Sequence, residues 1–164
     1  MRREERVIKI QSLLKVGDDL VPVEQFVGPI PDEDYIEGAL ELLVDNEPIF
    51  TREQVDYPDQ LWAYLIEGLE QIVAGREFST YYPDMPVKIV LRPQGERVTI
   101  NVDTRKKITE TSVPIDELCR AMASAGTTFF ERLQPLAPGN RSMYDGYIAR
   151  LASLTTAARR QFDG

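Results

Sequence analysis

The stretch from Asp56 to Gly75 constrains the fold most, because it combines a helix start, a wide apolar face and a helix end. Its apolar residues recur at steps of three and four, which places their side chains on one side of an α-helix. These residues are Leu61, Trp62, Leu65, Ile66, Leu69, Ile72 and Val73. Asp56 or Tyr57 can cap the helix ahead of Pro58, and Gly75 can adopt the left-handed conformation that ends it. We therefore predict a helix whose apolar face is buried.

Two later stretches have the same helical spacing. Pro114 opens a segment that runs to Leu136, with carboxylates at Asp116 and Glu117, where they suit the positive end of the helix dipole. Residues 142–162 form a third amphipathic segment. We expect a single domain over residues 1–139, and within residues 140–164 a C-terminal amphipathic helix packed on the domain or on a neighbouring chain.

Alternation of apolar and polar residues predicts strands in five other stretches. These stretches are residues 6–16, 35–44, 87–92, 98–103 and 108–113. Asp45 and Asn46 can turn the chain after the second of them into a short strand over residues 47–50, which Pro48 assigns to a sheet edge.

Turn and breaker residues complete the expected fold. Pro93, Gln94 and Gly95 can form the turn between the third and fourth strands, with Pro93 in the first central position. The segments 17–34 and 76–86 contain several glycines or prolines and are predicted as loops. Together the patterns predict an α+β fold: an antiparallel sheet of four to six strands, two long helices packed mainly on one face, and a C-terminal helix.

The chain contains no histidine and a single cysteine, Cys119. The missing histidine removes the commonest general base and the commonest metal ligand. One cysteine can form neither an internal disulfide nor a multi-cysteine metal site, and its helical surroundings favour a structural role. No glycine motif for phosphate binding occurs. The sequence therefore predicts no catalytic residue and no cofactor, although chemistry based on carboxylates or lysine remains open.

The charge is unevenly distributed along the chain. Residues 1–70 contain 17 acidic and 6 basic residues, whereas residues 71–164 contain 10 acidic and 13 basic residues, within a net charge of −8. An acidic field repels nucleic acid and anionic membranes and attracts a basic protein. We therefore expect a basic protein partner, and neither nucleic acid nor a membrane.

The sequence also predicts where the protein resides. No apolar run approaches the roughly 20 residues that span a bilayer. The charged start MRREERVIKI lacks the apolar core of a signal peptide. We expect a cytoplasmic protein that is mature from Met1.

Two groups of residues are the candidate contacts of a partner. The acidic group comprises Asp32, Glu33, Asp34, Glu37 and Glu41. The aromatic group is Tyr81 and Tyr82 in the stretch 76–86, because tyrosine is common at interface hot spots. The acidic run lacks the ligand spacing of a calcium loop, so no metal site is expected. The alternative is a solvated surface for the carboxylates and a core edge for the tyrosines.

Two further functions remain open. A small-molecule-binding protein, or an enzyme based on carboxylates, would use Glu37, Glu41 and Tyr35 near a pocket closed by residues 76–86. Such a function requires a deep pocket with at least two converging carboxylates. A structural homodimer would instead form through the C-terminal helix.

Several segments resemble those of a known kind of protein. They are YPDQLWAYLIEGLEQI, YYPDMP, VKIVLRP, and VPIDELCRAM followed by FFERL, all within residues 35–136. In these segments, and in its size and acidity, the chain resembles small acidic bacterial α+β proteins and the immunity proteins that neutralise bacterial toxins. The resemblance implies a cytosolic, non-catalytic protein that binds and blocks a toxin, and it assigns no binding residue.

Overall fold

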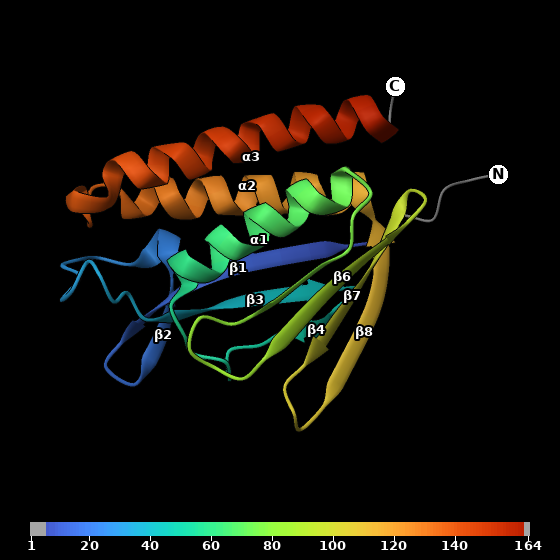
Figure 1. Ribbon diagram of the computed structural model, residues 1–164. Coiled ribbons are helices and arrows are strands. Elements are labelled where there is room, and N and C mark those ends of the chain that lie inside the picture. The colour runs from blue at the N-terminus through green and yellow to red at the C-terminus, as the bar shows by residue number, and fades with distance from the viewer. Residues whose placement is uncertain (1–5, 163–164) are drawn as a thin grey trace.

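The computed structural model describes residues 6–162 and has an α+β architecture (Figure 1). In this part of the chain, eight strands form two antiparallel sheets of four, and three α-helices gather on one side of them. The predicted α+β class is confirmed, with the strands divided between two sheets. Residues 1–5 of the predicted domain and residues 163–164 of the predicted C-terminal segment lie outside the described residues.

The first sheet has the strand order β2-β1-β3-β4. β1 covers Ile8–Val16, β2 covers Asp19–Pro22, β3 covers Gly38–Val44 and β4 covers Glu47–Phe50. Asp45 and Asn46 join β3 to β4 with φ angles of 51° and 67°, as two-residue hairpin turns require. β4 lies at an edge of the sheet, as Pro48 predicts.

The second sheet is a meander with the order β5-β6-β7-β8. β5 covers Phe78–Tyr81, β6 covers Lys88–Gln94, β7 covers Arg97–Asp103 and β8 covers Ile108–Pro114. The predicted turn is displaced by two residues, because Pro93 pairs with Val98 inside the hairpin and the turn is at Gly95 and Glu96. β5 begins at Phe78, opposite Leu91, and does not extend alongside Pro93. Pro93 is therefore tolerated, because no strand on that side needs a hydrogen bond from residue 93.

Two segments predicted as loops contain edge strands. β2 lies in residues 17–34 and β5 in residues 76–86. Both strands are only four residues long and pair on one side only. The glycines and prolines that indicated loops lie at the end of these strands or outside them, where they break no hydrogen bond of the sheet.

The three helices correspond to the predicted segments. α1 covers Pro58–Val73, α2 covers Ile115–Leu133 and α3 covers Arg141–Phe162, with short 3-10 helices η1 at Val23–Gln25 and η2 at Pro138–Asn140. Gly75 ends α1 with a φ of 80°. Its N–H bonds to the Ile72 carbonyl at 3.0 Å, and the Arg76 N–H bonds to the Gln71 carbonyl at 2.9 Å, which is the Schellman arrangement.

The predicted apolar face of α1 is the centre of the core. Its side chains from Leu61 to Ile72 are at most 1% exposed. Trp62 stacks on Phe129 of α2 and donates its indole N–H to the Ser12 hydroxyl in β1 at 3.0 Å. α1 contacts β3 of the first sheet, β5 and β6 of the second sheet, and both other helices. α3 packs on α2 and α1 of its own chain, as Figure 1 shows.

Asp56 joins three parts of the fold at the start of α1. Its backbone pairs with Gly38 of β3, and its side chain is 6% exposed. The carboxylate accepts hydrogen bonds from the backbone N–H groups of Tyr57 at 2.8 Å, Asp84 at 3.0 Å and Met85 at 2.9 Å. Asp56 therefore holds the loop between β5 and β6 against the helix and the first sheet, instead of capping α1 through its side chain.

Replacing Asp56 with alanine tests this connection. The N–H groups of Asp84 and Met85 would lose a charged acceptor, and a hydrogen bond to a charged group contributes about 1.5–3 kcal/mol. We expect Asp56→Ala to lower the free energy of unfolding by about 2–5 kcal/mol and Asp56→Asn to lower it less, because one acceptor oxygen remains. Urea unfolding followed by the fluorescence of Trp62 measures both changes. Equal stability of Asp56→Ala and the wild type would contradict the role of Asp56.

Candidate functional site

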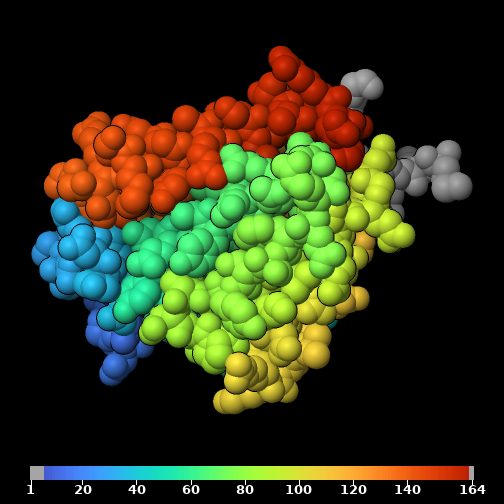
Figure 2. All heavy atoms as spheres, viewed as in Figure 1, coloured from blue at the N-terminus to red at the C-terminus, as the bar shows by residue number. Residues whose placement is uncertain are grey.

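The largest concentration of exposed carboxylates lies on the segment 17–37, between β1 and β3. This segment contains seven acidic residues and no lysine or arginine: Asp18, Asp19, Glu24, Asp32, Glu33, Asp34 and Glu37. We call it the acidic segment. β1 and β3 are neighbouring strands. The acidic segment therefore leaves the first sheet and returns to it at adjacent positions. The acidic segment therefore lies at one end of the molecule, in blue at the left of Figure 2.

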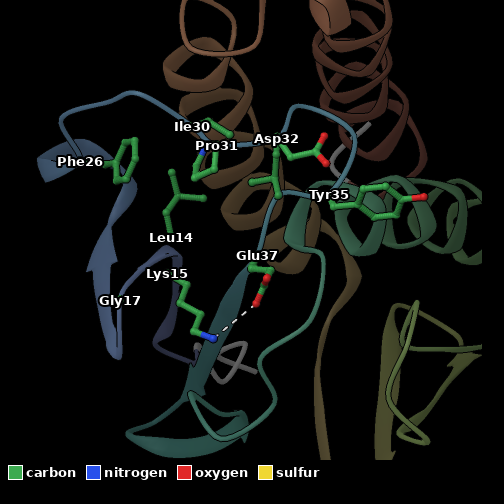
Figure 3. A pocket seen from close by; sticks show the side chains of 10 residues that line it. Leu14, Lys15, Gly17, Phe26, Ile30, Pro31, Asp32, Tyr35 and Glu37 are labelled. Carbon is green, nitrogen blue, oxygen red and sulfur yellow. Dashed lines mark hydrogen bonds and ion pairs between the residues drawn. The ribbon is translucent and has the colours of Figure 1, made fainter.

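A pocket of about 380 Å³ opens beneath the acidic segment (Figure 3). Its apolar lining comes from Leu14 of β1 and from Phe26, Ile30 and Ile36 of the segment. Lys15, Asp32, Tyr35 and Glu37 provide its charged and polar atoms. The pocket can therefore hold the apolar part of a side chain while the surrounding carboxylates contact a positive charge.

A chain of hydrogen bonds holds the acidic segment against the helices. The Asn140 side-chain amide donates to the Glu33 carbonyl at 2.8 Å and to the Tyr144 hydroxyl at 3.3 Å. The Tyr144 hydroxyl in turn donates to the carboxylate of Asp59 in the first turn of α1 at 3.0 Å. The backbone of Glu33 is thus linked through α3 to α1, although these residues are distant in sequence.

Asp59 is a buried carboxyl in this chain of hydrogen bonds. Burial raises its pKa above the ordinary value of 3.8, while hydrogen bonds from Tyr144 and from the Gln60 N–H act in the opposite direction. Burial also raises the pKa of the Tyr144 hydroxyl, and the nearby Asp59 adds to that rise. The hydroxyl therefore stays protonated and remains the donor to Asp59.

The predicted acidic contacts occupy different positions around the pocket. Asp32, Asp34 and Glu37 are exposed, whereas Glu33 and Glu41 are half-buried. Glu37 pairs with Lys15 at 3.4 Å. Glu41 pairs with Arg52 at 2.8 Å and does not line the pocket. Of the five, Asp32 and Glu37 contribute directly to the pocket wall.

The carboxylates of the pocket do not converge. Figure 3 shows Glu37 turned towards Lys15 and Asp32 turned away from Glu37. Among residues 6–162, no group of three or more acidic or cysteine side chains is arranged to hold a metal ion. The pocket is not closed by residues 76–86, none of which lines it. The arrangement expected for a carboxylate enzyme is therefore not found at this pocket.

The two predicted tyrosines have different environments. Tyr81 is exposed at the end of β5 and lies outside the pocket lining. Tyr82 is 3% exposed and packs edge-on against Phe50 of β4. Its predicted role in a binding surface is wrong, because its ring belongs to the core and cannot reach a partner in this fold.

Other apolar residues are better placed for a contact. Tyr35 is 62% exposed at the pocket rim and packs edge-on against Tyr57, with the ring centres 5.9 Å apart. Partial burial raises the pKa of the Tyr57 phenol, and the carboxylates of Asp84 and Glu37 raise it further. Val27, in the same segment as Tyr35, is 89% exposed. Hydrophobicity alone did not indicate which apolar residues of this segment face outwards.

Cys119 is fully buried in α2. Burial, together with the charge of the neighbouring Asp116, raises the pKa of its thiol to about 12. The thiol is therefore protonated at neutral pH and has no access to a substrate.

Comparisons of the chain with models of protein families, with curated proteins and with solved structures find no significant match. Within residues 6–162, no helix has both the length and the apolar character required to cross a bilayer.

The pKa of Asp59 predicts a pH-dependent stability difference. The pKa of Asp59 is raised in the folded state. Its contribution to stability is therefore complete below pH 3.8, the ordinary pKa, and is lost as the pH rises through the folded-state pKa. Asparagine keeps an acceptor for Tyr144 without a charge. We expect Asp59→Asn to match the wild type at about pH 4 and to become progressively more stable than it towards about pH 8, as measured by urea unfolding.

Asp45 provides a control of opposite sign. The Val7 N–H, followed by Arg6, lowers the pKa of its carboxyl, so its stabilisation is present above 3.8 and is lost as the pH falls through the folded-state pKa. Asp45→Asn should be less stable than the wild type at neutral pH and should approach it in acid. A constant difference between Asp59→Asn and the wild type across the pH range would contradict the assignment for Asp59.

Proposed function

We propose that this protein is a non-catalytic binding protein that recognises a basic protein partner through the acidic segment. The observation that carries the proposal is the concentration of seven carboxylates, without any lysine or arginine, in residues 17–37. Such a surface attracts a basic partner from a distance and disfavours acidic competitors. The proposed contacts are Asp32, Asp34 and Glu37, which are exposed on this segment.

Exposed apolar side chains among the carboxylates support a protein partner. Tyr35 and Val27 are both largely exposed, and an aromatic anchor surrounded by polar residues is typical of an interface hot spot. The pocket beside Tyr35 has a volume of about 380 Å³. A lysine or arginine of the partner could place its methylene groups against Leu14 and Phe26 and its charge near Glu37.

The available chemistry favours binding over catalysis. The chain has no histidine, Cys119 is buried with a raised thiol pKa, and Asp32 is turned away from Glu37. An acid and a base positioned on a common substrate atom would require side chains that converge. We therefore propose that the protein acts without a cofactor.

The resemblance to immunity proteins suggests what such binding achieves. We propose that the partner is a basic bacterial toxin and that the protein neutralises it in the cytoplasm by covering its functional surface. Co-expression of the captured partner with this protein should then protect bacterial cells from growth arrest, whereas the partner alone should arrest growth. If the partner binds but the cells are not protected, the proposed binding function stands and the immunity role is excluded.

Charge neutralisation tests the acidic segment directly. We expect the wild type to capture a basic protein from native cytosol at low salt and to release it as the salt concentration rises. The variant Asp32→Asn/Asp34→Asn/Glu37→Gln should bind that protein at least about tenfold more weakly, because two or more charge contacts are lost. Affinity of the purified partner for each protein, measured by calorimetry, checks the difference.

A matched control separates a local contact from net charge. The variant Glu67→Gln/Glu96→Gln/Glu131→Gln removes the same number of charges from exposed positions outside the acidic segment. It should bind the partner within about twofold of the wild type, because single distant surface charges contribute little. Equal losses in both variants, or the absence of any partner at low salt, would contradict the proposal.

A further inference from the structure

Within residues 6–162, three of the four sheet edges carry features that hinder the addition of another strand. A free edge exposes unpaired backbone N–H and C=O groups, and charged residues or prolines block it. β2 includes Asp19 and Pro22, and β4 includes Glu47 and Pro48. Prolines lack the N–H that an added strand would need. Both edges of the first sheet are therefore protected.

Arginine side chains protect the edge at β8. The Thr104 N–H bonds to the Lys107 carbonyl, so Thr104 and Lys107 form a hydrogen-bonded pair. Hydrogen-bonded and non-hydrogen-bonded pairs alternate along an antiparallel ladder. Thr99 and Ser112 are therefore a non-hydrogen-bonded pair, and the Ser112 carbonyl points away from β7. That carbonyl accepts hydrogen bonds from the guanidinium groups of Arg6 and Arg97, each at 3.0 Å. One of the outward-facing acceptors that an added strand would use is therefore already bonded, and β8 also includes Glu110 and Pro114.

The edge at β5 has no comparable protection. Its sequence, Phe78–Tyr81, contains neither a charged residue nor a proline, and within residues 6–162 no strand pairs with it on the side opposite β6. Figure 2 shows the green part of the chain around residue 80 at the surface that faces the viewer. β5 is thus the edge most suited to accept another strand.

The pairing of β5 with β6 determines which backbone groups face outwards. The Tyr82 N–H bonds to the Val87 carbonyl at 2.9 Å, so residues 82, 80 and 78 direct their backbone groups to β6. Ser79 and Tyr81, in the alternate positions, therefore direct their N–H and C=O groups away from the sheet. The Tyr81 carbonyl accepts one side-chain hydrogen bond, from Thr80 at 3.2 Å, and retains a second lone pair.

We propose that two copies of this chain associate by antiparallel pairing of their β5 strands around a two-fold axis at Thr80. In this register Ser79 lies opposite the partner's Tyr81, and Tyr81 lies opposite the partner's Ser79. Each pair consists of outward-facing residues and exchanges two backbone hydrogen bonds, as the hydrogen-bonded pairs of an antiparallel ladder do. The two second sheets then form one continuous sheet of eight strands.

Charge complementarity supports a second copy as the occupant. The same register brings Arg76, two residues before β5, towards the end of the partner's β5, where Asp84 lies in the loop that follows the strand, and the two-fold axis repeats this approach at the other end. Arg76 and Asp84 are exposed, and opposite charges across a strand pair are favourable. In the antiparallel arrangement each end of the short strand therefore has residues of opposite charge on the two copies.

This inference is independent of the proposed function and adds to it. No residue of β5 lines the pocket beneath the acidic segment, so pairing leaves both pockets open. A dimer would present two acidic segments, and a partner with two basic sites would bind with an avidity above that of one contact.

The oligomeric state of the full chain tests the pairing. Sedimentation equilibrium from about 5 to about 500 μM protein covers the range of small interfaces, which associate weakly. We expect the wild type to shift from the monomer mass of 18.7 kDa towards twice that mass. Ser79→Pro removes an outward N–H and should stay monomeric, whereas the matched control Ser79→Ala keeps that N–H and should dimerise like the wild type. Circular dichroism shows whether each variant is folded.

Charge reversal tests the register without changing β5. Asp84→Arg places like charges opposite each other at both ends and should raise the dimer dissociation constant about tenfold. The double variant Arg76→Asp/Asp84→Arg reverses both charges and should return it to within about threefold of the wild type. If Ser79→Pro fails to fold, the dissociation constants of these two charge variants test the proposal.

Three results would overturn the proposal. A wild type that stays at the monomer mass over the whole range excludes it. A folded Ser79→Pro variant that dimerises like the wild type assigns the interface to another surface, such as α3. Equal dissociation constants for Asp84→Arg, the double variant and the wild type exclude the register.

Discussion

The burial of one face of α1 is the constraint on which the rest of the fold depends. Among the described residues, the two sheets are not joined by strand pairing, so each needs another element to cover its apolar face. α1 contacts strands of both sheets and both other helices. Six of its apolar side chains are at most 1% exposed, and their burial contributes roughly 9–18 kcal/mol. That is comparable with the entire net stability of a typical domain.

Polar contacts at the start of α1 give this apolar packing a unique arrangement. Asp56 connects the helix to β3 and to the loop between β5 and β6, while Asp59 connects it through Tyr144 to α3. A buried acceptor without its donor is costly, so these contacts select one position of each loop. The same chain of bonds reaches Glu33 through Asn140, and the core thereby determines the position of the acidic segment.

The proposed binding surface and the proposed dimer interface use different kinds of recognition. The acidic segment offers charge and two exposed apolar side chains, which suits attraction and selection of a basic partner. β5 offers backbone groups in a fixed alternation, which suits pairing with an identical strand. Because they belong to different sheets, each can be occupied without blocking the other. The fold thus presents its charge and its open sheet edge on separate surfaces.

The sequence by itself determined the helices, the turn at Asp45 and Asn46 and the edge position of β4, because periodicity and turn chemistry act within a few residues. It also determined that the chain is acidic in its first half. Only the tertiary structure decided that β2 and β5 are strands, that Tyr82 is buried while Val27 is exposed, and that Glu37 but not Glu41 lines the pocket. These outcomes depend on contacts between residues far apart in the chain, such as Tyr82 with Phe50 and Glu33 with Asn140, which no local pattern records.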